Sequence, residues 1–300
     1  MAVPIIHHPA FDANFDAHHR FPMSKFTRLA EILIEDGVVG AVGFHVPAPA
    51  LPGWLRLAHD PRYVDQVLFA AVLAEVEKAI GFAVDERVAM RSRCATGGTV
   101  LAARLALAEG LACNTAGGSH HAHRAAGAGF SVFNDVAVAA SVVIADGDVD
   151  RILVVDCDVH QGDGTARIFA DEPRVFTLSI HAERNYPSEK ARSDMDVGLA
   201  DGTGDDGYLD ALRTALPAAF DAARPDLVFY NAGVDPHRDD RLGRLALTDA
   251  GLCERDRQVF GFFRERGIPV AAVIGGGYLR DIDALARRHS ILHRIANEFV

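Results

Sequence analysis

The chain has 300 residues, of which 49% are hydrophobic, and a formal net charge of −11. This much apolar material is enough to bury a substantial core, in one α/β domain or in two small ones. The negative charge argues against broad contact with nucleic-acid phosphates, which bind clustered Lys and Arg, and only weakly favours a cationic substrate or partner.

The cysteines and the first residues indicate the compartment. The four cysteines are widely spaced and form no CxxC pair, which is typical of reduced, mostly buried thiols in a cytosolic protein. The segment M-A-V-P-I-I-H-H-P lacks a basic region followed by an apolar core, so we expect no signal peptide. The longest apolar run, residues 136–145, is far shorter than the ~20 residues of a membrane span. We therefore expect a cytoplasmic protein without a membrane span; its oligomeric state is not predicted.

The first quarter of the chain is predicted to consist of scaffold and loops. Ser24 is expected to cap a helix over residues 25–36, which Gly37 closes. Pro61 should open a second helix that includes residues 63–79. The other predicted features are a short edge strand at residues 3–6 and a stiff turn at residues 48–53.

From residue 97 onward, predicted strands alternate with predicted helices. The strands are 111–115, 151–155, 174–180, 226–231 and 270–274. The helices are 99–109, 134–145, 206–223, 248–266 and a closing helix after Tyr278. This alternation indicates a parallel sheet with helices on both faces. Because no linker divides the chain, we expect one three-layer α/β domain over residues 1–300.

The run R-I-L-V-V-D-C-D-V-H-Q-G-D-G at residues 151–164 is the centre of this pattern. Its β-branched, apolar start is typical of a strand buried on both faces of a parallel sheet. If the chain stays extended, Asp156, Asp158 and His160 share one face of it. Two carboxylates and an imidazole are costly to bury together unless something compensates them, and a divalent cation is the usual compensation.

Polar side chains also follow the other predicted strands. In open α/β sheets, ligands bind beyond the carboxyl ends of the strands. Residues that follow different strands should therefore meet at one edge of the sheet. The residues in question are His120, His121, Asp156, Asp158, His160, Asp163, Asp235 and Tyr278.

Their chemistry suggests roles. Asp158, His160 and Asp235 offer two oxygens and one nitrogen, and three protein ligands with an open position are the pattern of a catalytic zinc site. None of these three ligands is a thiolate, which argues against a closed structural zinc site. The adjacent His120 and His121 suit general acid–base work, because imidazole titrates near neutral pH.

Two further roles complete this set. Each of the two histidines needs a carboxylate to orient its other nitrogen, and Asp156 and Asp163 are the available candidates. Tyr278 follows three glycines and could donate a hydrogen bond to a developing oxyanion. Taken alone, Tyr278 would be better explained as a packed aromatic residue at a helix start.

Five segments resemble the histone deacetylase superfamily in their order along the chain. They are G-G-S-H-H-A-H at 117–123, G-A-G-F at 127–130, D-C-D-V-H-Q-G-D-G at 156–164, N-A-G-V-D-P-H at 231–237 and G-G-G-Y at 275–278. The chain looks most like the class IV branch and its bacterial relatives, because of Gln161 and the segment D-D-R-L-G-R-L at 239–245. The resemblance covers the chain from about residue 20 onward.

The resemblance implies the arginase/deacetylase fold, in which one parallel sheet of about eight strands lies between helix layers. It implies one zinc ion on Asp158, His160 and Asp235. It also implies that His121, backed by Asp163, is the principal proton-transfer residue. His120, paired with Asp156, would stabilise the water and the transition state, and Tyr278 would polarise the acyl carbonyl.

The family's other sites map onto this sequence as well. The tube that receives the acylated lysine side chain would be lined by Gly129, Phe130 and Leu242. A structural potassium ion would be held by the carboxylate of Asp156, the hydroxyl of Ser179 and the backbone carbonyls of Asp158, His160 and Ile180. The segment T-L-S-I-H at 177–181 fits that potassium site. The loop at residues 181–201 diverges from the family, so the resemblance does not predict which residues form the substrate-facing rim.

The implied activity is zinc-dependent hydrolysis of an N-acyl-lysine amide, acetyl or longer, in proteins or peptides. An acetylpolyamine hydrolase acting on small acylated amines is an alternative. A binuclear manganese ureohydrolase of the same fold is disfavoured, because neither Gly162 nor the residues two positions from Asp235, Gly233 and His237, supplies the extra carboxylate. A non-catalytic acyl-lysine binder is disfavoured by the full set of catalytic residues. Acyl length, physiological substrate, and zinc versus ferrous iron stay open.

Overall fold

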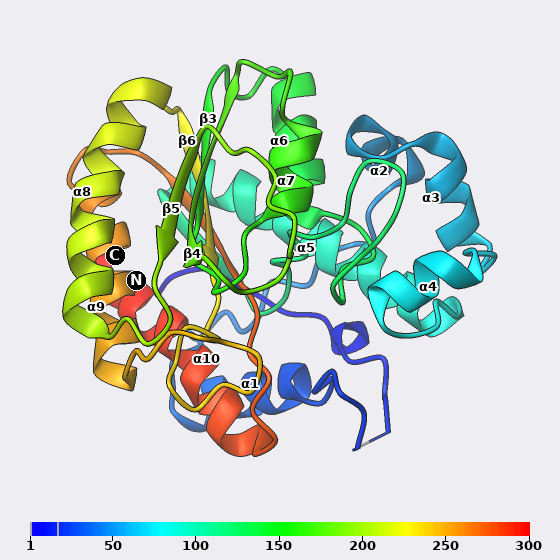
Figure 1. The fold of residues 1–300 in the computed structure, drawn as a ribbon, viewed down its shortest axis with the longest axis horizontal. Coiled ribbons are helices and arrows are strands. Elements are labelled where there is room, and N and C mark those ends of the chain that lie inside the picture. The colour runs from blue at the N-terminus through cyan, green and yellow to red at the C-terminus, as the bar shows by residue number, and fades with distance from the viewer. Residues whose placement is uncertain (1, 17) are drawn as a thin grey trace.

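The structure is a computed structural model that describes residues 2–16 and 18–300 (Figure 1). Its centre is a sheet in which all paired strands are parallel, in the order β1-β2-β7-β6-β3-β4-β5. The strands are β1 (Ile5–Ile6), β2 (Leu111–Asn114), β3 (Ile152–Asp156), β4 (Val175–Ala182), β5 (Met195–Leu199), β6 (Leu227–Ala232) and β7 (Val270–Ile274). The described residues thus form seven strands, where about eight were expected.

Helices cover both faces of this sheet, as the α/β prediction requires. They are α1 (Lys25–Glu35), α2 (Pro52–Ala58), α3 (Pro61–Leu68), α4 (Ala74–Ile80), α5 (Glu86–Glu109), α6 (Asp135–Ala145), α7 (Asp163–Ile168), α8 (Asp205–Ala223), α9 (Asp249–Arg264) and α10 (Ile282–Ala296). Helices α8, α9 and α10 pack side by side on one face, and α5 with α6 covers the other (Figure 1). The three-layer α/β architecture is confirmed.

The central strands form where the sequence is continuously apolar. Every residue of β2, β3, β6 and β7 is buried, because helices cover both faces of the sheet there. The predicted strands agree with the observed ones to within two residues at each end. Since these four strands are consecutive in the order β2-β7-β6-β3, their carboxyl ends lie next to one another at one edge.

Several local predictions were wrong. The helix predicted from Pro61 to residue 79 is two helices, because the backbone of Ala70 turns into the left-handed region (φ 48°) between α3 and α4. Helix α5 begins at Glu86, where the side chain of Asp85 caps it, and not at residue 99. Ser24 makes no capping hydrogen bond with its side chain, since its own backbone is already helical.

Two further segments differ from expectation. The stiff turn predicted at residues 48–53 already contains the start of α2. The edge strand β5 lies in the divergent loop, where no strand was predicted. In the described residues, no helix combines the length and the apolar composition needed to cross a membrane. The single-domain organisation over residues 1–300 stays a prediction.

Candidate active site

The carboxyl ends of four neighbouring strands supply the polar side chains of the site. His120 and His121 follow β2, and Asp158, His160 and Asp163 follow β3. Asp235 follows β6 and Tyr278 follows β7. The sheet order therefore explains how residues that are more than 150 positions apart in the sequence come together.

The chain does not stay extended from Asp156 to His160. Strand β3 ends at Asp156, and residues 158–160 form a bend. Two side-chain contacts stabilise this bend, because the amide of Asp158 donates to Oδ1 of Asp156 (3.1 Å) and the amide of His160 donates to Oδ1 of Asp158 (2.9 Å). The expected extended run was wrong, although its three polar residues still enter one site.

Asp158, His160 and Asp235 form a buried cluster that could hold a metal ion. One ligand atom from each residue lies within 4.8 Å of those of the other two. Nδ1 of His160 lies 3.0 Å from Oδ1 of Asp158 and 3.1 Å from Oδ2 of Asp235. In the described part of the chain, Oδ2 of Asp235 is buried without a hydrogen-bond partner. A buried carboxylate oxygen without a partner is costly, and a cation bound to it would remove that cost.

The charges of the cluster favour a cation as well. Burial, and then the charge of Asp158, raise the pKa of Asp235 to about 7. Burial would lower the pKa of His160, but the neighbouring carboxylates of Asp158 and Asp235 outweigh burial and raise it to about 10. Two buried carboxylates this close repel each other unless positive charge lies between them. The donors, their convergence and their charge therefore fit a divalent cation.

A glycine allows the backbone to approach these carboxylates. The amide of Gly276, in the loop after β7, donates to Oδ2 of Asp158 (2.6 Å). A Cβ atom at this position would lie 2.0 Å from Oδ2 of Asp235 and 2.7 Å from Oδ2 of Asp158. The three glycines before Tyr278 thus include one whose missing side chain makes room for the cluster.

Two histidines lie beside the cluster, and each contacts a carboxylate through Nδ1. Nδ1 of His120 is 2.6 Å from Oδ2 of Asp156, and Nδ1 of His121 is 2.7 Å from Oδ1 of Asp163. A carboxylate at Nδ1 favours the proton on that nitrogen, which leaves Nε2 for other partners. The pairing expected from the sequence is therefore the one observed in the geometry.

The two imidazoles differ in charge. Burial would lower the pKa of His120, but the charges of Asp156 and Asp158 outweigh it and raise the pKa to about 9. Burial, together with the charge of His120, lowers the pKa of His121 to about 3. His121 is thus neutral at physiological pH and able to accept a proton at Nε2. A divalent cation on Asp158 would offset part of the charge that favours protonated His120.

A cavity of about 350 Å³ leads from the surface to this site. Gly129, Phe130 and Leu242 line it, as expected, together with His121, His160 and Tyr278. Tyr186 also lines it, and its ring packs edge-on against His121 with centroids 4.8 Å apart. Gly129 has φ +51°, and a Cβ there would lie 2.5 Å from the His121 ring and 3.1 Å from Tyr186. The passage is therefore narrow where it reaches His121.

Tyr278 lies where this cavity meets the cluster. Its ring centroid is 6.1 Å from that of His160, and its amide donates to Oδ2 of Asp240 (2.7 Å). Burial, and then the charge of Asp158, raise the pKa of Tyr278 well above its ordinary value. The hydroxyl group therefore stays protonated and can donate a hydrogen bond.

The comparison with known proteins identifies the family. A family model described as the histone deacetylase domain matches residues 19–293. The chain belongs to the histone deacetylase family. An uncharacterized protein of Picosynechococcus sp. is 48% identical over 298 residues, which cover 99% of both chains. Histone deacetylase 2 of Arabidopsis thaliana is 33% identical over 290 residues, which cover 93% of this chain and 75% of that protein.

A solved structure has the same fold. The HD domain of HDA15 superimposes with a TM-score of 0.84 at 21% identity, over 99% of this chain and 89% of that one. The histone deacetylase superfamily and the arginase/deacetylase-like fold are thus confirmed. Membership also makes this protein a hydrolase of the deacetylase family. The assignment to the class IV branch stays a prediction.

The potassium site of the histone deacetylase family stays a prediction, although its expected residues are neighbours. Asp156 in β3 pairs directly with Ser179 in β4, and Ile180 comes next along that strand. The Ser179 hydroxyl lies 2.9 Å from Nδ1 of His181. Strand pairing therefore brings two of the expected side chains to the same place.

Sequence reasoning missed four residues that support this site. Nδ2 of Asn231 donates to Oδ1 of Asp156 (2.9 Å), a role that its position in N-A-G-V-D-P-H could have suggested. Arg255, buried in α9, donates to the carbonyls of Cys157 and Gly233 and so holds the loops after β3 and β6. Such a contact from a helix interior leaves no signal in the sequence.

The other two missed residues are Lys25 and Tyr186. Nζ of Lys25 is buried and lies 3.5 Å from the carbonyl of Gly275 and 3.4 Å from that of Gly277, which fixes the glycine loop. Burial lowers the pKa of Lys25 to about 8. Tyr186 belongs to the divergent loop, where no family segment marks it.

Proposed function

We propose that this protein is a zinc-dependent amidohydrolase that removes acetyl or longer acyl groups from the lysine side-chain nitrogen. The observation that supports this most strongly is the buried cluster of Asp158, His160 and Asp235 at the inner end of a narrow cavity. The two histidine–carboxylate pairs beside it supply the acid and base groups that amide hydrolysis needs.

Asp158, His160 and Asp235 would hold the ion. When bound there, Zn²⁺ would supply a Lewis acid that lowers the pKa of water and polarises a carbonyl group. Three protein ligands leave an open position for substrate. The absence of a thiolate among the three donors fits a catalytic rather than a structural site.

The chain's own residues would move the protons. Nε2 of His121 accepts a proton from the attacking water, since Asp163 keeps the proton of His121 on Nδ1. The water oxygen bonds to the acyl carbon, the bond from that carbon to the lysine nitrogen breaks, and the amine leaves with a proton returned by a histidine. His120, oriented by Asp156, stabilises the charge that develops.

Tyr278 would stabilise the oxyanion. Its protonated hydroxyl group can donate to the acyl oxygen, and such a donor acts on charge that develops in the transition state. The narrow passage past Gly129 and Tyr186 suits an unbranched side chain such as that of lysine.

Two alternatives receive less support. A binuclear site would need further carboxylates, and in the described residues one group of candidate ligands is found. His237, two positions beyond Asp235 in the sequence, contacts Asp239 (3.6 Å) and Asp249 (3.4 Å) and not the cluster. An acetylpolyamine hydrolase would use the same chemistry on a smaller substrate. That substrate is a cation, so the entrance of such an enzyme must accept positive charge.

A substrate panel tests the proposal. Zinc-loaded protein is incubated with lysine peptides that carry acetyl, butyryl or myristoyl groups, and with acetylspermidine, and the released amine is quantified. We expect hydrolysis of at least one acyl-lysine peptide at a higher kcat/KM than acetylspermidine. Elemental analysis of the protein as purified, before zinc loading, should give one metal ion per chain. Two manganese ions per chain, or hydrolysis of acetylspermidine alone, would replace this proposal with one of the alternatives.

A further inference from the structure

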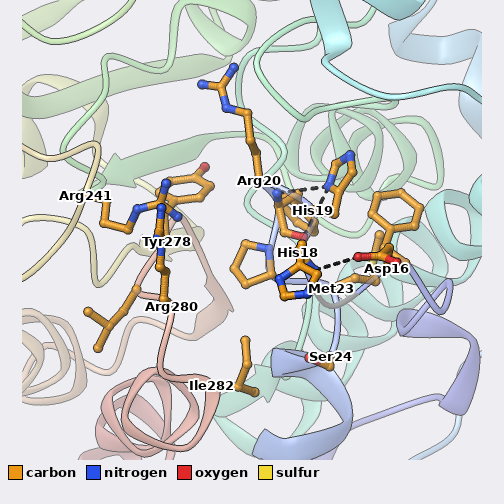
Figure 2. Close-up of a pocket in the computed structure, with 14 residues that line it drawn as sticks. Asp16, His18, His19, Arg20, Met23, Ser24, Arg241, Tyr278, Arg280 and Ile282 are labelled. Carbon is orange, nitrogen blue, oxygen red and sulfur yellow. Dashed lines mark hydrogen bonds between the residues drawn. The ribbon is translucent and has the colours of Figure 1, made fainter.

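A second cavity, of about 400 Å³, lies beside Tyr278, outside the passage described above (Figure 2). Arg20, Arg241 and Arg280 line it. These arginines come from three separate segments: the loop before α1, the loop after Asp235 and the start of the segment that leads into α10. In Figure 2, Tyr278 lies between Arg241 and Arg20.

The second cavity lies next to the substrate entrance. Arg20 and Tyr278 line both cavities. A substrate whose acyl group reaches Tyr278 could therefore place a neighbouring group in the second cavity. The entrance cavity adds another cation, Lys78, and no acidic residue lines it in the described structure.

The three arginines lack acidic partners within the described residues. Exposed arginines such as Arg56 and Arg213 form ion pairs with Asp65 (2.7 Å) and Asp210 (2.5 Å), whereas Arg20, Arg241 and Arg280 form none in the described chain. Asp16 is the acidic residue of the lining, and its Oδ1 accepts a hydrogen bond from the amide of His18 (2.8 Å; Figure 2). Positive charge is thus concentrated around the second cavity and the substrate entrance, although the net charge of the whole chain is −11.

This arrangement suits a carboxylate. Guanidinium groups bind carboxylates through charge-assisted and often bidentate hydrogen bonds. Arg241 and Arg280 line the second cavity, and Arg20 lies at its border with the entrance, where its Cζ is 6.0 Å from the centre of the Phe130 ring. Together they would attract an anion and repel a cation in the same place. The net negative charge of the chain would by itself suit a basic peptide or a polyamine. The local charge at the entrance is positive and suits an anionic group instead.

We propose that the preferred substrate is an acyl-lysine compound with a carboxylate next to the acylated residue, which Arg20, Arg241 and Arg280 bind. This inference rests on the proposed deacylase function and specifies its substrate class. The carboxylate can come from an acidic residue that flanks the acyl-lysine in a protein, or from the α-carboxyl group of a free N-acyl-lysine.

The test compares substrates of different charge, with Glu against Gln and a carboxylate against its carboxamide as the pairs of nearly equal shape. Acetyl-lysine peptides flanked by Glu, Gln or Lys form one arm, and free Nε-acetyl-lysine and its α-carboxamide form the other. For each pair, kcat/KM is measured with the zinc-loaded wild type and with the double variant Arg241→Gln, Arg280→Gln. Arg151→Gln is the matched control, because Arg151 is exposed at the opposite, amino-terminal end of β3.

We expect the Glu-flanked peptide, or free acetyl-lysine over its carboxamide, to be preferred by about tenfold, which corresponds to about 1.4 kcal/mol. The double variant should reduce this ratio to near one, and Arg151→Gln should leave it unchanged. The arm in which the preference appears identifies the source of the carboxylate. Three results would overturn the inference. They are equal kcat/KM for the charged and the neutral substrate within both arms, a preference for the Lys-flanked peptide, and an undiminished preference for the carboxylate in the double variant. Failure to hydrolyse any of these acetyl-lysine substrates would instead contradict the proposed deacylase function.

Discussion

Tyr278 is the residue at which the two cavities and the metal-ligand cluster meet. Its backbone is fixed by Asp240, while its hydroxyl group makes no hydrogen bond within the described residues. The ring also packs near Phe21 and Phe130, so its position does not depend on the hydroxyl group. The side chain is therefore held in place with its donor group available.

Replacing Tyr278 with Phe removes this donor and little else. We expect kcat to fall about 100- to 1000-fold, the range for loss of one oxyanion donor, with the metal content and the thermal unfolding temperature preserved. Turnover of an acetyl-lysine peptide and elemental analysis measure these quantities.

Tyr186→Phe is the matched control for that experiment. It removes a hydroxyl group from the same cavity, but Tyr186 contacts His121 through its ring and is 46% exposed. Its activity should stay within about threefold of the wild type, since the ring contact remains. A Tyr278→Phe variant that turns over at the wild-type rate would remove Tyr278 from the mechanism.

At the scale of elements, the loop after β7 shapes the cluster through its backbone. Gly276→Ala would place a methyl group 2.0 Å from Oδ2 of Asp235. We expect metal affinity to fall at least about tenfold, as for other changes that displace a ligand's supporting contacts. Metal titration followed by competition with a chelator measures this. Gly53→Ala in α2 is the control, because its Cβ would meet no atom within 4 Å. Unchanged metal affinity in Gly276→Ala would contradict this prediction, because it would mean that the loop moves aside without displacing Asp235.

The elements that deliver the site were predictable because they are buried. Strands β3, β6 and β7 are continuous apolar runs, and the edge at which their polar residues meet follows from parallel pairing. The edge strand β5 has a half-exposed alternation that five residues cannot distinguish from a loop. The first half of α5 was missed because Gly97 and Gly98 lie inside it.

Other parts of the rim of the site could not be predicted, for a different reason. Tyr186 and Arg20 lie in loops outside the family segments, and the paths of such loops depend on tertiary contacts and not on a periodic pattern. Residues inside the family segments, such as Asp156 and His120, could be paired in advance because the segments fix their order and spacing. The charge of the entrance could not be inferred from the net charge of the chain.

At the scale of the whole molecule, several histidines are buried away from the site. Burial lowers the pKa of His59 to about 4 and that of His293 to about 3. Both nitrogens of His293 lack hydrogen-bond partners in the described residues. These side chains are neutral in the folded protein and gain protons, near their ordinary pKa of about 6.5, when the chain unfolds.

The protein should therefore lose stability in mild acid. Below about pH 6.5 the unfolded chain binds more protons than the folded one, so the free energy of unfolding falls as the pH falls toward the lowered pKa values. For His293 we expect a loss of roughly 2 kcal/mol between about pH 7 and pH 5. Denaturant unfolding at several pH values measures the slope, and His293→Leu should make it shallower. Equal slopes for the wild type and His293→Leu would contradict this account of the acid sensitivity.

The two ends of the parallel strands also differ in how well they should tolerate an inserted segment. The side chains assigned to chemistry extend from the carboxyl ends of the strands, while short turns such as the one between α6 and β3 join the elements at the other end. That turn contains Gly147, where an added Cβ atom would meet nothing within 4 Å. An affinity tag or a fluorescent label inserted there would be carried on the side remote from substrate, which makes this turn the place at which to tether the enzyme to a surface.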